Sequence, residues 1–438
     1  MMDQVVLQNP NLFGNMKLQS YWLDTAPPFE GESGKLGGTA DVAIIGGGFT
    51  GLSAALALSK KGARVVLVEM ATVGNGGSGR NGGMCSNGLA IDFSTAVKLL
   101  GHERAKVAYK SYDTAVDVVE RIVKEENIDC NFVRSGKIRL ASKPAHFERL
   151  QKSYDVLRRG VDQETVLFSR EQLHTQIGSD KFFGGLGQNK SAAMHMGKFV
   201  RGLATAARKN GAQIFESAAM TDLRRLGGFR HEIRTSRGSF EASQVLIASG
   251  ALTRKPQFFR RRIVPVGSFI IVTEPLPEEV AAGLLPTRRN ASNTRNLVNY
   301  FRLTPDNRLL FGGRARFALS SPTSDVKSGH ILHAEMTRVF PQLRNTRIDY
   351  CWGGLVDLTH DRLPRAGEHD GLFYSIGYSG HGTQMATYMG TVMADVLGGK
   401  AASNIWGDLD WPAVPGHFGP PWFLPFVGAY YRFKDLVS

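Results

Sequence analysis

Three glycines, Gly46, Gly48 and Gly51, follow an apolar run at residues 41–45 with the spacing G-x-G-x-x-G. The next apolar run ends at Glu69, 18 residues beyond Gly51. Glycines at this spacing allow a sharp turn and the close approach of a diphosphate to the backbone, and the acid can accept hydrogen bonds from a ribose diol. The pattern therefore predicts a dinucleotide site, and the acid disfavours a coenzyme that carries a 2′-phosphate.

A second glycine-rich segment, residues 73–84, comes directly after the run that ends at Glu69. Its small residues leave the backbone bare, so a flat ring system and a diphosphate could lie against it. Arg80 is available as a counter-charge, with Ser78 and Asn81 as hydrogen-bond donors. Composition alone also fits a flexible surface loop, but the position beside the first turn favours the coenzyme.

A third turn of this kind lies near the C-terminal end. The apolar run 372–376 leads into a segment at 377–383 that is rich in glycine, and a helix is expected at 384–397. The unpaired N–H groups and the dipole at a helix N-terminus favour negative charge, so we expect a second anion-binding turn here. No later strand is followed by a second G-x-G-x-x-G and an acid, so a separate NAD site is not expected.

Residues 46–53, Glu69 and residues 76–83 together resemble the D-amino-acid-oxidase-like (DAO) superfamily of FAD enzymes, and within it the γ-glutamylputrescine oxidases. The resemblance implies that the first turn binds the ADP half of FAD, that residues 76–83 line the flavin, and that the third turn stabilises negative charge on the flavin ring. The motifs and the resemblance together place the following residues at FAD: Gly46, Gly48, Phe49, Thr50, Gly51, Glu69, Met70, Ser78, Gly79, Arg80, Asn81, Gly82, Gly83, Met84, Met220, Ala248, Gly250, Gly380, Gly382 and Thr383.

The expected fold is α/β with an α+β part: a Rossmann-like FAD-binding domain interleaved with a mixed-sheet substrate domain. Strand patterns recur at 263–266, 269–273, 299–303 and 309–312, whereas an apolar stripe between 108 and 123 has helical spacing. The expected division is an N-terminal extension at 1–38, an FAD-binding domain at 39–95, 195–255 and 345–400, a substrate domain at 96–194 and 256–344, and a C-terminal tail at 401–438.

The activity implied by the resemblance is oxidation of an amine or amino acid. A hydride would pass from the carbon next to nitrogen to flavin N5, the imine would hydrolyse to an aldehyde or keto acid, and the electrons would go to O2, giving H2O2, or to a quinone. Because the coenzyme carries the hard step, the protein must mainly hold the substrate. A flavin-dependent hydroxy-acid or glycerol-phosphate dehydrogenase and a non-enzymatic nucleotide-binding or nucleic-acid-binding module are the alternatives.

Four residues are candidates for the substrate side. Arg302 could clamp a carboxylate bidentately, with Tyr300 on the same strand, or it could be a surface arginine paired with Asp306. His381 could orient the substrate or tune the flavin ring, and Trp352 could wall the pocket or pack in the core. His195 also has a counterpart in the family, where proline usually follows it, but Met196 stands there in this chain.

The cysteines Cys85, Cys130 and Cys351 are isolated, so no disulfide framework is expected and a reducing, cytoplasmic location fits best. In sarcosine oxidase and similar members of the family a cysteine attaches the flavin at the position that corresponds to Gly354. Cys351 lies three residues away from that position, so we expect FAD to be held non-covalently. The sequence shows no metal-ligand pattern and no secretory signal.

The chain of 438 residues carries a formal net charge of +14, which fits an acidic substrate, a polyanion or an anionic membrane surface. Because no long Lys/Arg tract or RNA-binding aromatic run occurs, nucleic acid is not expected as a partner. The segment 411–431 is rich in aromatic residues and proline. Such a tail usually wraps its own domain, but peripheral membrane contact through it stays open.

Overall fold

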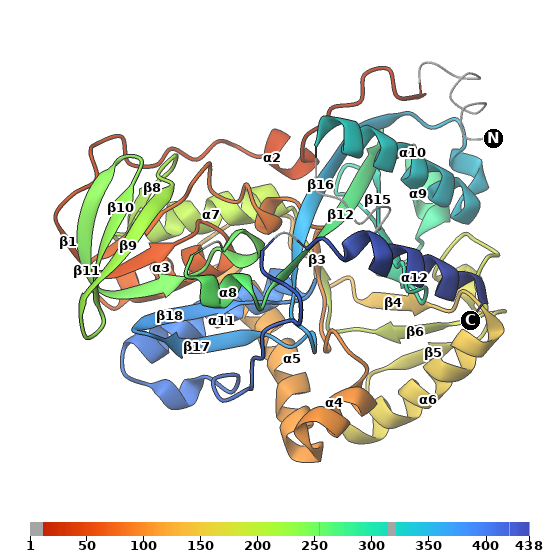
Figure 1. Cartoon of the computed structure of the whole chain (residues 1–438). Coiled ribbons are helices and arrows are strands. Elements are labelled where there is room, and N and C mark those ends of the chain that lie inside the picture. Colours follow the sequence, from red (N-terminus) through yellow and green to blue (C-terminus); the bar gives the residue numbers. More distant parts are fainter. Residues whose placement is uncertain (1–11, 254, 314–320, 420, 438) are drawn as a thin grey trace.

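The computed structural model describes residues 12–253, 255–313, 321–419 and 421–437, so the first eleven residues of the expected N-terminal extension lie outside it (Figure 1). One eight-stranded sheet has the order β17-β18-β11-β1-β2-β8, with β10 and β9 continuing from β11 as antiparallel strands. Its strands are β1 (Thr39–Ile45), β2 (Val65–Val68), β8 (Gln213–Phe215), β9 (Met220–Gly227), β10 (Arg230–Thr235), β11 (Gly238–Ile247), β17 (Arg365–His369) and β18 (Leu372–Ile376). The pairs β1–β2, β1–β11, β2–β8 and β11–β18 are parallel.

Both faces are covered in the parallel part of this sheet, which explains why β1 is almost continuously apolar. Val42 and Ile44 point into a core shared with the helices, whereas Ala43 and Ile45 point into a second core on the other face. The helices of the first core are α3 (Phe49–Lys60), α5 (His102–Glu125), α7 (Met196–Lys209) and α11 (Gly382–Leu397). The helix expected at 384–397 is therefore confirmed by α11.

The second eight-stranded sheet is mixed, and only its β13–β4 pair is parallel. Its order is β16-β12-β15-β14-β13-β4-β6-β5. The strands are β4 (Lys137–Leu140), β5 (Val166–Phe168), β6 (Gly185–Gln188), β12 (Val264–Thr273), β13 (Asn290–Asn293), β14 (Asn299–Leu303), β15 (Leu309–Gly313) and β16 (Ile348–Leu358). Its apolar face packs against α10 (Pro322–Val339) and α9 (Glu278–Leu284). A two-stranded sheet, β3 (Met84–Cys85) with β7 (Ala192–Ala193), completes the strands.

The described residues form five further helices. They are α2 (Tyr21–Asp24), α4 (Phe93–Leu100), α6 (Pro144–Gly160), α8 (Gln257–Arg260) and α12 (Leu424–Val437), with 3-10 turns at Gly77–Gly79, Leu173–Thr175, Gly250–Leu252, Pro341–Leu343 and Ala401–Ser403. Among the described residues, no helix combines the length and the apolar character needed to cross a membrane.

Two segments lie elsewhere than the expected domain division suggests. The strand β16 pairs with β12 from Ile348 to Leu358, so this part of 345–400 belongs to the second sheet. The helix α5, expected in the substrate domain, packs its Tyr112 and Val119 in the core that also contains Met385 of α11. Apolar spacing reveals that an element is buried but not which neighbour covers it, and this is why both assignments differ.

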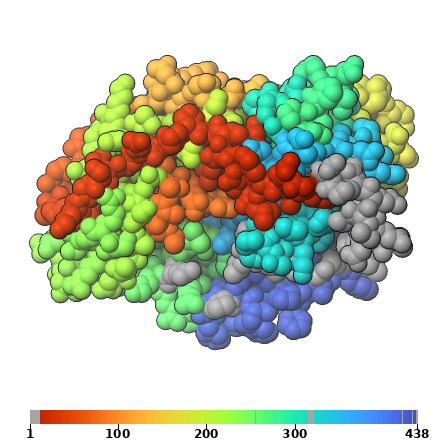
Figure 2. All heavy atoms as spheres, turned by 90° about the horizontal axis from the view of Figure 1, so that it is seen from above, coloured from red at the N-terminus to blue at the C-terminus, as the bar shows by residue number. Residues whose placement is uncertain are grey.

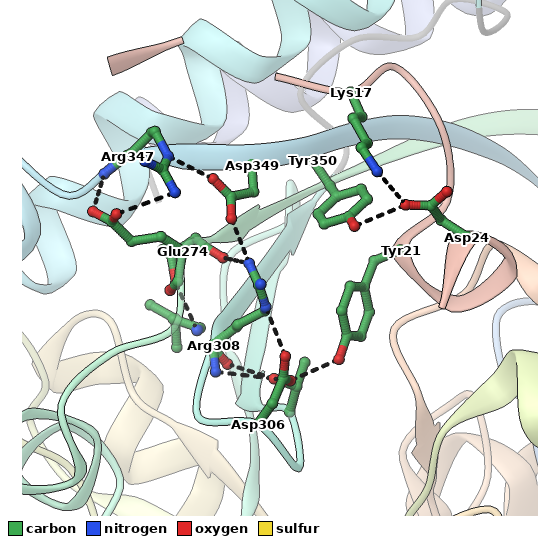
Figure 3. A network of polar contacts seen from close by, with 12 residues as sticks. Lys17, Tyr21, Asp24, Glu274, Asp306, Arg308, Arg347, Asp349 and Tyr350 are labelled. Carbon is green, nitrogen blue, oxygen red and sulfur yellow. Dashed lines mark hydrogen bonds and ion pairs between the residues drawn. The ribbon is translucent and has the colours of Figure 1, made fainter. Parts of the chain in front are cut away.

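Residues 12–38, which we call the N-terminal strap, run across the outside of both sheets (Figure 2). The backbone of Lys17 bonds to Asp349 and Cys351 on β16, and Glu32 donates to the carbonyl of Ile214 on β8. Figure 3 shows the polar network at one end of the strap. There Asp24 binds Lys17 and Tyr350, and Tyr21 donates to Asp306, which also pairs with Arg308. The strap is therefore an integral part of the fold.

Candidate active site

The first glycine-rich turn joins β1 to α3. Gly46 has φ +119°, and a Cβ there would lie 2.7 Å from the carbonyl oxygen of Ala248. A Cβ at Gly51 would overlap the carbonyl oxygen of Gly46, so only glycine allows helix and strand to pack this closely. At the end of β2 the Glu69 carboxylate accepts the N–H of Gly47 at 2.8 Å, and burial raises the pKa of Glu69.

The second glycine-rich segment lies against the N-terminus of α3. Ser78 Oγ accepts the backbone N–H of Phe49 at 2.9 Å, and a Cβ at Gly48 would lie 2.9 Å from that Oγ. The side chain of Asn81 bonds within the loop, to the carbonyl of Ser78 and the N–H of Gly83. Asn81 therefore shapes the loop, whereas the sequence suggested a donor that faces a ligand.

Side chains from outside this loop donate hydrogen bonds to four of its backbone carbonyls. Ser20 Oγ donates to the carbonyl of Gly79 at 2.5 Å, and Trp352 Nε1 donates to that of Arg80 at 3.0 Å. Trp22 Nε1 donates to the carbonyl of Asn81 at 2.7 Å, and Arg302 Nη1 donates to that of Gly83. These donors come from the strap, from β16 and from β14. They fix the loop because a shielded carbonyl that loses its donor is costly, and only the Gly83 carbonyl of these four also accepts a backbone N–H, that of Met194, among the described residues.

Arg302 does not lie on the surface and does not pair with Asp306. Its side chain is 3% exposed and donates to the carbonyls of Gly83, Met194 and Leu303. Burial lowers the pKa of Arg302 to about 10. Its neighbour Tyr300 bonds to Ser268 through its hydroxyl, and a Cβ at Gly82 would lie 2.8 Å from its ring. Both predicted substrate residues therefore support the glycine-rich loop in this structure.

The third turn joins β18 to α11, and it is tied directly to the first. The hydroxyl of Tyr378 lies 2.7 Å from Thr50 Oγ1 on α3 and 2.8 Å from Ser375 Oγ on β18. Behind the turn, Asp357 Oδ2 on β16 accepts the N–H of Gly377 at 2.7 Å, and burial raises the pKa of Asp357 to about 6. The N-termini of α3 and α11 therefore belong to one site. Tyr378 lies within the predicted third turn but was not itself singled out from the sequence, and Asp357 lies outside the predicted motifs.

A family model described as FAD dependent oxidoreductase (DAO) matches residues 41–396, which include all three turns. The chain belongs to this family. The gamma-glutamylputrescine oxidoreductase of Escherichia coli strain K12 is 31% identical over 91% of this chain and 94% of that protein. A probable oxidoreductase of Haemophilus influenzae is 32% identical over 90% of this chain and 92% of that protein. The crystal structure of glycine oxidase from Geobacillus kaustophilus superposes with a TM-score of 0.69 at 23% identity, covering 87% of this chain and 98% of that one.

The residues at the three turns fit the FAD that this oxidoreductase family uses. The glycines of the first turn leave a backbone cradle that a side chain would fill. Arg80 donates only to the carbonyls of Asn75 and Gly353, and no ion pair with a carboxylate is formed by Arg80 within the described ranges. A half-buried cation that forms no ion pair among the described residues is suited to a diphosphate or to a flavin ring that gains negative charge.

The other residues predicted to contact FAD differ in their exposure and in the elements to which they belong. Phe49 and Thr383 are buried, Gly380 is exposed, and the side chain of Met70 is 55% exposed. Met220 begins β9, and a Cβ at Gly250 would lie 3.6 Å from the carboxylate of Asp357. Met84 pairs with Ala193 between β3 and β7, and Gly382 begins α11. Contact of any of these residues with FAD remains a prediction.

The strand β16 also bears on how the flavin is held. Trp352 and Gly354 face the glycine-rich loop, and a Cβ at Gly354 would lie 3.1 Å from the Cβ of Arg80. Because side chains alternate along a strand, Cys351 faces the opposite side, where its Sγ lies 3.2 Å from the carbonyl of Asp325. Burial raises the pKa of all three cysteine thiols. These positions favour non-covalent FAD.

Buried polar groups gather at the N-terminus of α11. His381 Nδ1, Gln384 Oε1 and the Tyr112 hydroxyl have no hydrogen-bond partner among the described residues. The rings of Tyr112 and His381 lie 5.9 Å apart, and Gln384 Nε2 donates to the carbonyl of Ser86 at 2.5 Å. Burial lowers the pKa of His381 to about 3, and the positive charge of Lys137 adds to this effect. His381 is therefore uncharged at neutral pH.

Lys137 reaches this group from β4 and was not predicted from the sequence. Its Nζ donates to the carbonyl of Asn87, which follows the Ser86 carbonyl that Gln384 binds. Burial lowers the pKa of Lys137 to about 8, so most of its ammonium is still charged at neutral pH. By contrast, His195 accepts the N–H of Lys198 and caps α7. That contact gives His195 a structural role.

Proposed function

We propose that this FAD-dependent oxidoreductase oxidises an amine that also carries a carboxylate, a substrate of the γ-glutamylputrescine type. Its Escherichia coli relative is named for that substrate, and a 27% identical relative from Geobacillus kaustophilus is a glycine oxidase. When bound, FAD would take a hydride from the carbon next to nitrogen and deliver the electrons to O2 or a quinone. The substrate then loses its N–H proton, and water hydrolyses the resulting imine to an aldehyde or keto acid.

The observation that carries this proposal is the uncharged imidazole of His381 at the N-terminus of α11, whose Nδ1 has no hydrogen-bond partner among the described residues. An amine gives up a hydride only when its nitrogen is not protonated. A charged imidazole would repel a substrate ammonium, whereas a neutral one can accept a hydrogen bond from the nitrogen and its proton as the imine forms. His381 therefore has the charge state that amine oxidation requires.

Lys137 supports the second half of the proposal, the carboxylate. Its ammonium lies in a buried setting where an anion is attracted more strongly than in water. Gln384 donates its Nε2 to the Ser86 carbonyl, so its unpartnered Oε1 is suited to accept a hydrogen bond from the substrate nitrogen and leaves the carboxylate to Lys137. A substrate that spans from His381 to Lys137 would place its nitrogen and its carboxylate on different side chains. Lys137 thus replaces Arg302 as the residue that we propose for the carboxylate.

Anaerobic reduction of the enzyme-bound flavin tests the proposal. We expect γ-glutamylputrescine to bleach the visible flavin absorbance faster than putrescine, which lacks the carboxylate, and faster than lactate or glycerol 3-phosphate. The substitution Lys137→Met should raise KM for γ-glutamylputrescine about tenfold and leave KM for putrescine unchanged. Lys98→Met, at an exposed lysine of α4, is the matched control.

Reduction by the hydroxy compounds alone would overturn the amine assignment and favour the dehydrogenase alternative. An equal effect of Lys137→Met on KM for both amines would show that Lys137 does not bind the carboxylate. It would not contradict the proposal that the enzyme oxidises amines. A colourless protein that takes up no added FAD would contradict the enzymatic reading as a whole. Oxygen consumption and quinone reduction, measured side by side, then identify the acceptor.

A further inference from the structure

The C-terminal helix α12 turns its aromatic side chains outward. Phe426, Tyr430 and Phe433 are 70%, 59% and 63% exposed, and Trp422 and Phe418 just before the helix are each 66% exposed. Positions 426, 430 and 433 lie on one face of a helix, because side chains four and three residues apart are neighbours. Single exposed apolar residues are common, but a continuous aromatic face of this kind marks a binding surface.

The opposite face of α12 is bonded to the body of the protein. These contacts keep the aromatic side chains of α12 directed outward. The carboxylate of Asp435 accepts the N–H groups of Asn296 and Leu297 at 2.8 and 2.9 Å and the side-chain amide of Asn296 at 2.8 Å. Lys143 Nζ donates to the carbonyl of Asp435 at 3.1 Å, and Leu424 and Gly428 are buried. Figure 1 shows α12, in dark blue, on the outside of the molecule.

Positive charge borders the aromatic face. The guanidinium of Arg261 lies 5.2 Å from the ring centre of Phe418, and the exposed Arg260 lies beside Gly419. Neither arginine forms an ion pair with a carboxylate of the described residues. Lys434 is exposed near the other end of the helix, and Asp435, bound as described above, is the only acid in the sequence from 411 to 437.

We propose that α12 together with Phe418, Gly419 and residues 421–423, here called the aromatic platform, binds the surface of an anionic lipid bilayer. Trp, Tyr and Phe beside basic residues suit the interface between acyl chains and headgroups. Lysine and arginine close to the surface add attraction to anionic lipids. The helix has 14 residues, so its length of about 21 Å falls short of the roughly 30 Å of a bilayer core, and it lies in the interface plane. The charge around the platform favours lipid over a second, equally basic copy of this chain.

Vesicle flotation of the full FAD-loaded chain tests the platform. We expect binding to vesicles of phosphatidylcholine with phosphatidylglycerol, weaker binding to phosphatidylcholine alone, and release as salt rises. The double substitution Phe426→Ser and Phe433→Ser should reduce vesicle binding about tenfold or more, because it removes two anchors from the interface. The control Phe229→Ser removes a 46% exposed aromatic from the β9–β10 hairpin and should leave binding unchanged.

Flavin absorbance and thermal unfolding, unchanged in the double variant, show that the variant is folded and loaded with coenzyme. Equal flotation of the wild-type chain and the double variant would overturn the proposal. So would absence of flotation together with a dimer that the double variant converts to a monomer, since a second copy would then cover the platform. These readouts do not depend on the substrate, so failure of the proposed function would leave them interpretable.

Discussion

Replacing His381 by asparagine should remove a defined part of the enzyme's sensitivity to acid. The pKa of His381 is about 3 in the folded chain against an ordinary value of 6.5, chiefly because of burial. Between these values the unfolded chain binds a proton that the folded chain does not. Stability contributed by the neutral imidazole is therefore complete above pH 6.5 and is lost as the pH falls toward 3.

The size of the effect follows from the two pKa values. At about pH 5 the unfolded imidazole is almost fully protonated and the folded one is not, which lowers the free energy of unfolding by about 2 kcal/mol relative to about pH 7.5. Asparagine does not titrate, so the His381→Asn variant lacks this loss. Other histidines, including His195 with its pKa lowered to about 4, are present in both chains and cancel in the comparison.

Chemical unfolding at about pH 7.5 and about pH 5 measures the loss of unfolding free energy on acidification in each chain. We expect this loss to be smaller in the His381→Asn variant than in the wild-type chain. An equal loss of stability in both chains on acidification would refute the reasoning. So would an imidazole signal assigned to His381 by NMR that titrates near its ordinary pKa. In either case His381 would be charged in mildly acidic solution and could not serve as a neutral partner for an amine.

Three further predictions concern the glycine-rich loop and the attachment of the flavin. Arg302→Met should lower the free energy of unfolding by roughly 2 kcal/mol, because it leaves the Met194 carbonyl without its donor and removes one of the two donors of the Gly83 carbonyl. An unchanged melting temperature together with a raised KM would instead support the original prediction that Arg302 binds the substrate carboxylate. Trp22→Phe should weaken FAD binding about tenfold by freeing the Asn81 carbonyl, as measured by flavin fluorescence. Tyr21→Phe, which loses only its bond to Asp306, is the control, and equal weakening by both would remove the special role of Trp22. Acid precipitation should release the flavin into the supernatant, and a yellow pellet would mean covalent attachment.

The local elements of the FAD side could be predicted closely from the sequence. Residues 372–376 form β18 and residues 299–303 form β14, because short apolar runs bounded by turn residues have few other options in a sheet. The turn at Gly46 was equally predictable, since a positive φ and a close carbonyl restrict the position to glycine. In these places the local sequence and the tertiary structure impose the same constraint.

Residues that act at a distance could not be predicted in this way. Trp22 holds a carbonyl 59 positions along the chain, and Lys137 approaches His381 from a different sheet. Arg302 was expected to bind an anion because arginine often does, but its neighbours are carbonyl oxygens that its residue type does not reveal. Pairings of this kind follow from the topology of the two sheets, which apolar spacing does not encode.

Through the contacts of Ser20 and Trp22 with the loop that we predict to line the flavin, the N-terminal strap would help to hold the coenzyme. A protease that cuts between the strap and β1 would weaken the hold of the strap on the loop, although Trp22 and Leu36 of the strap also pack in the cores of the first sheet. The bound flavin, and with it the yellow colour, would then be lost before the chain unfolds. Its yellow colour thus reports, without any added label, whether residues 12–38 are in place.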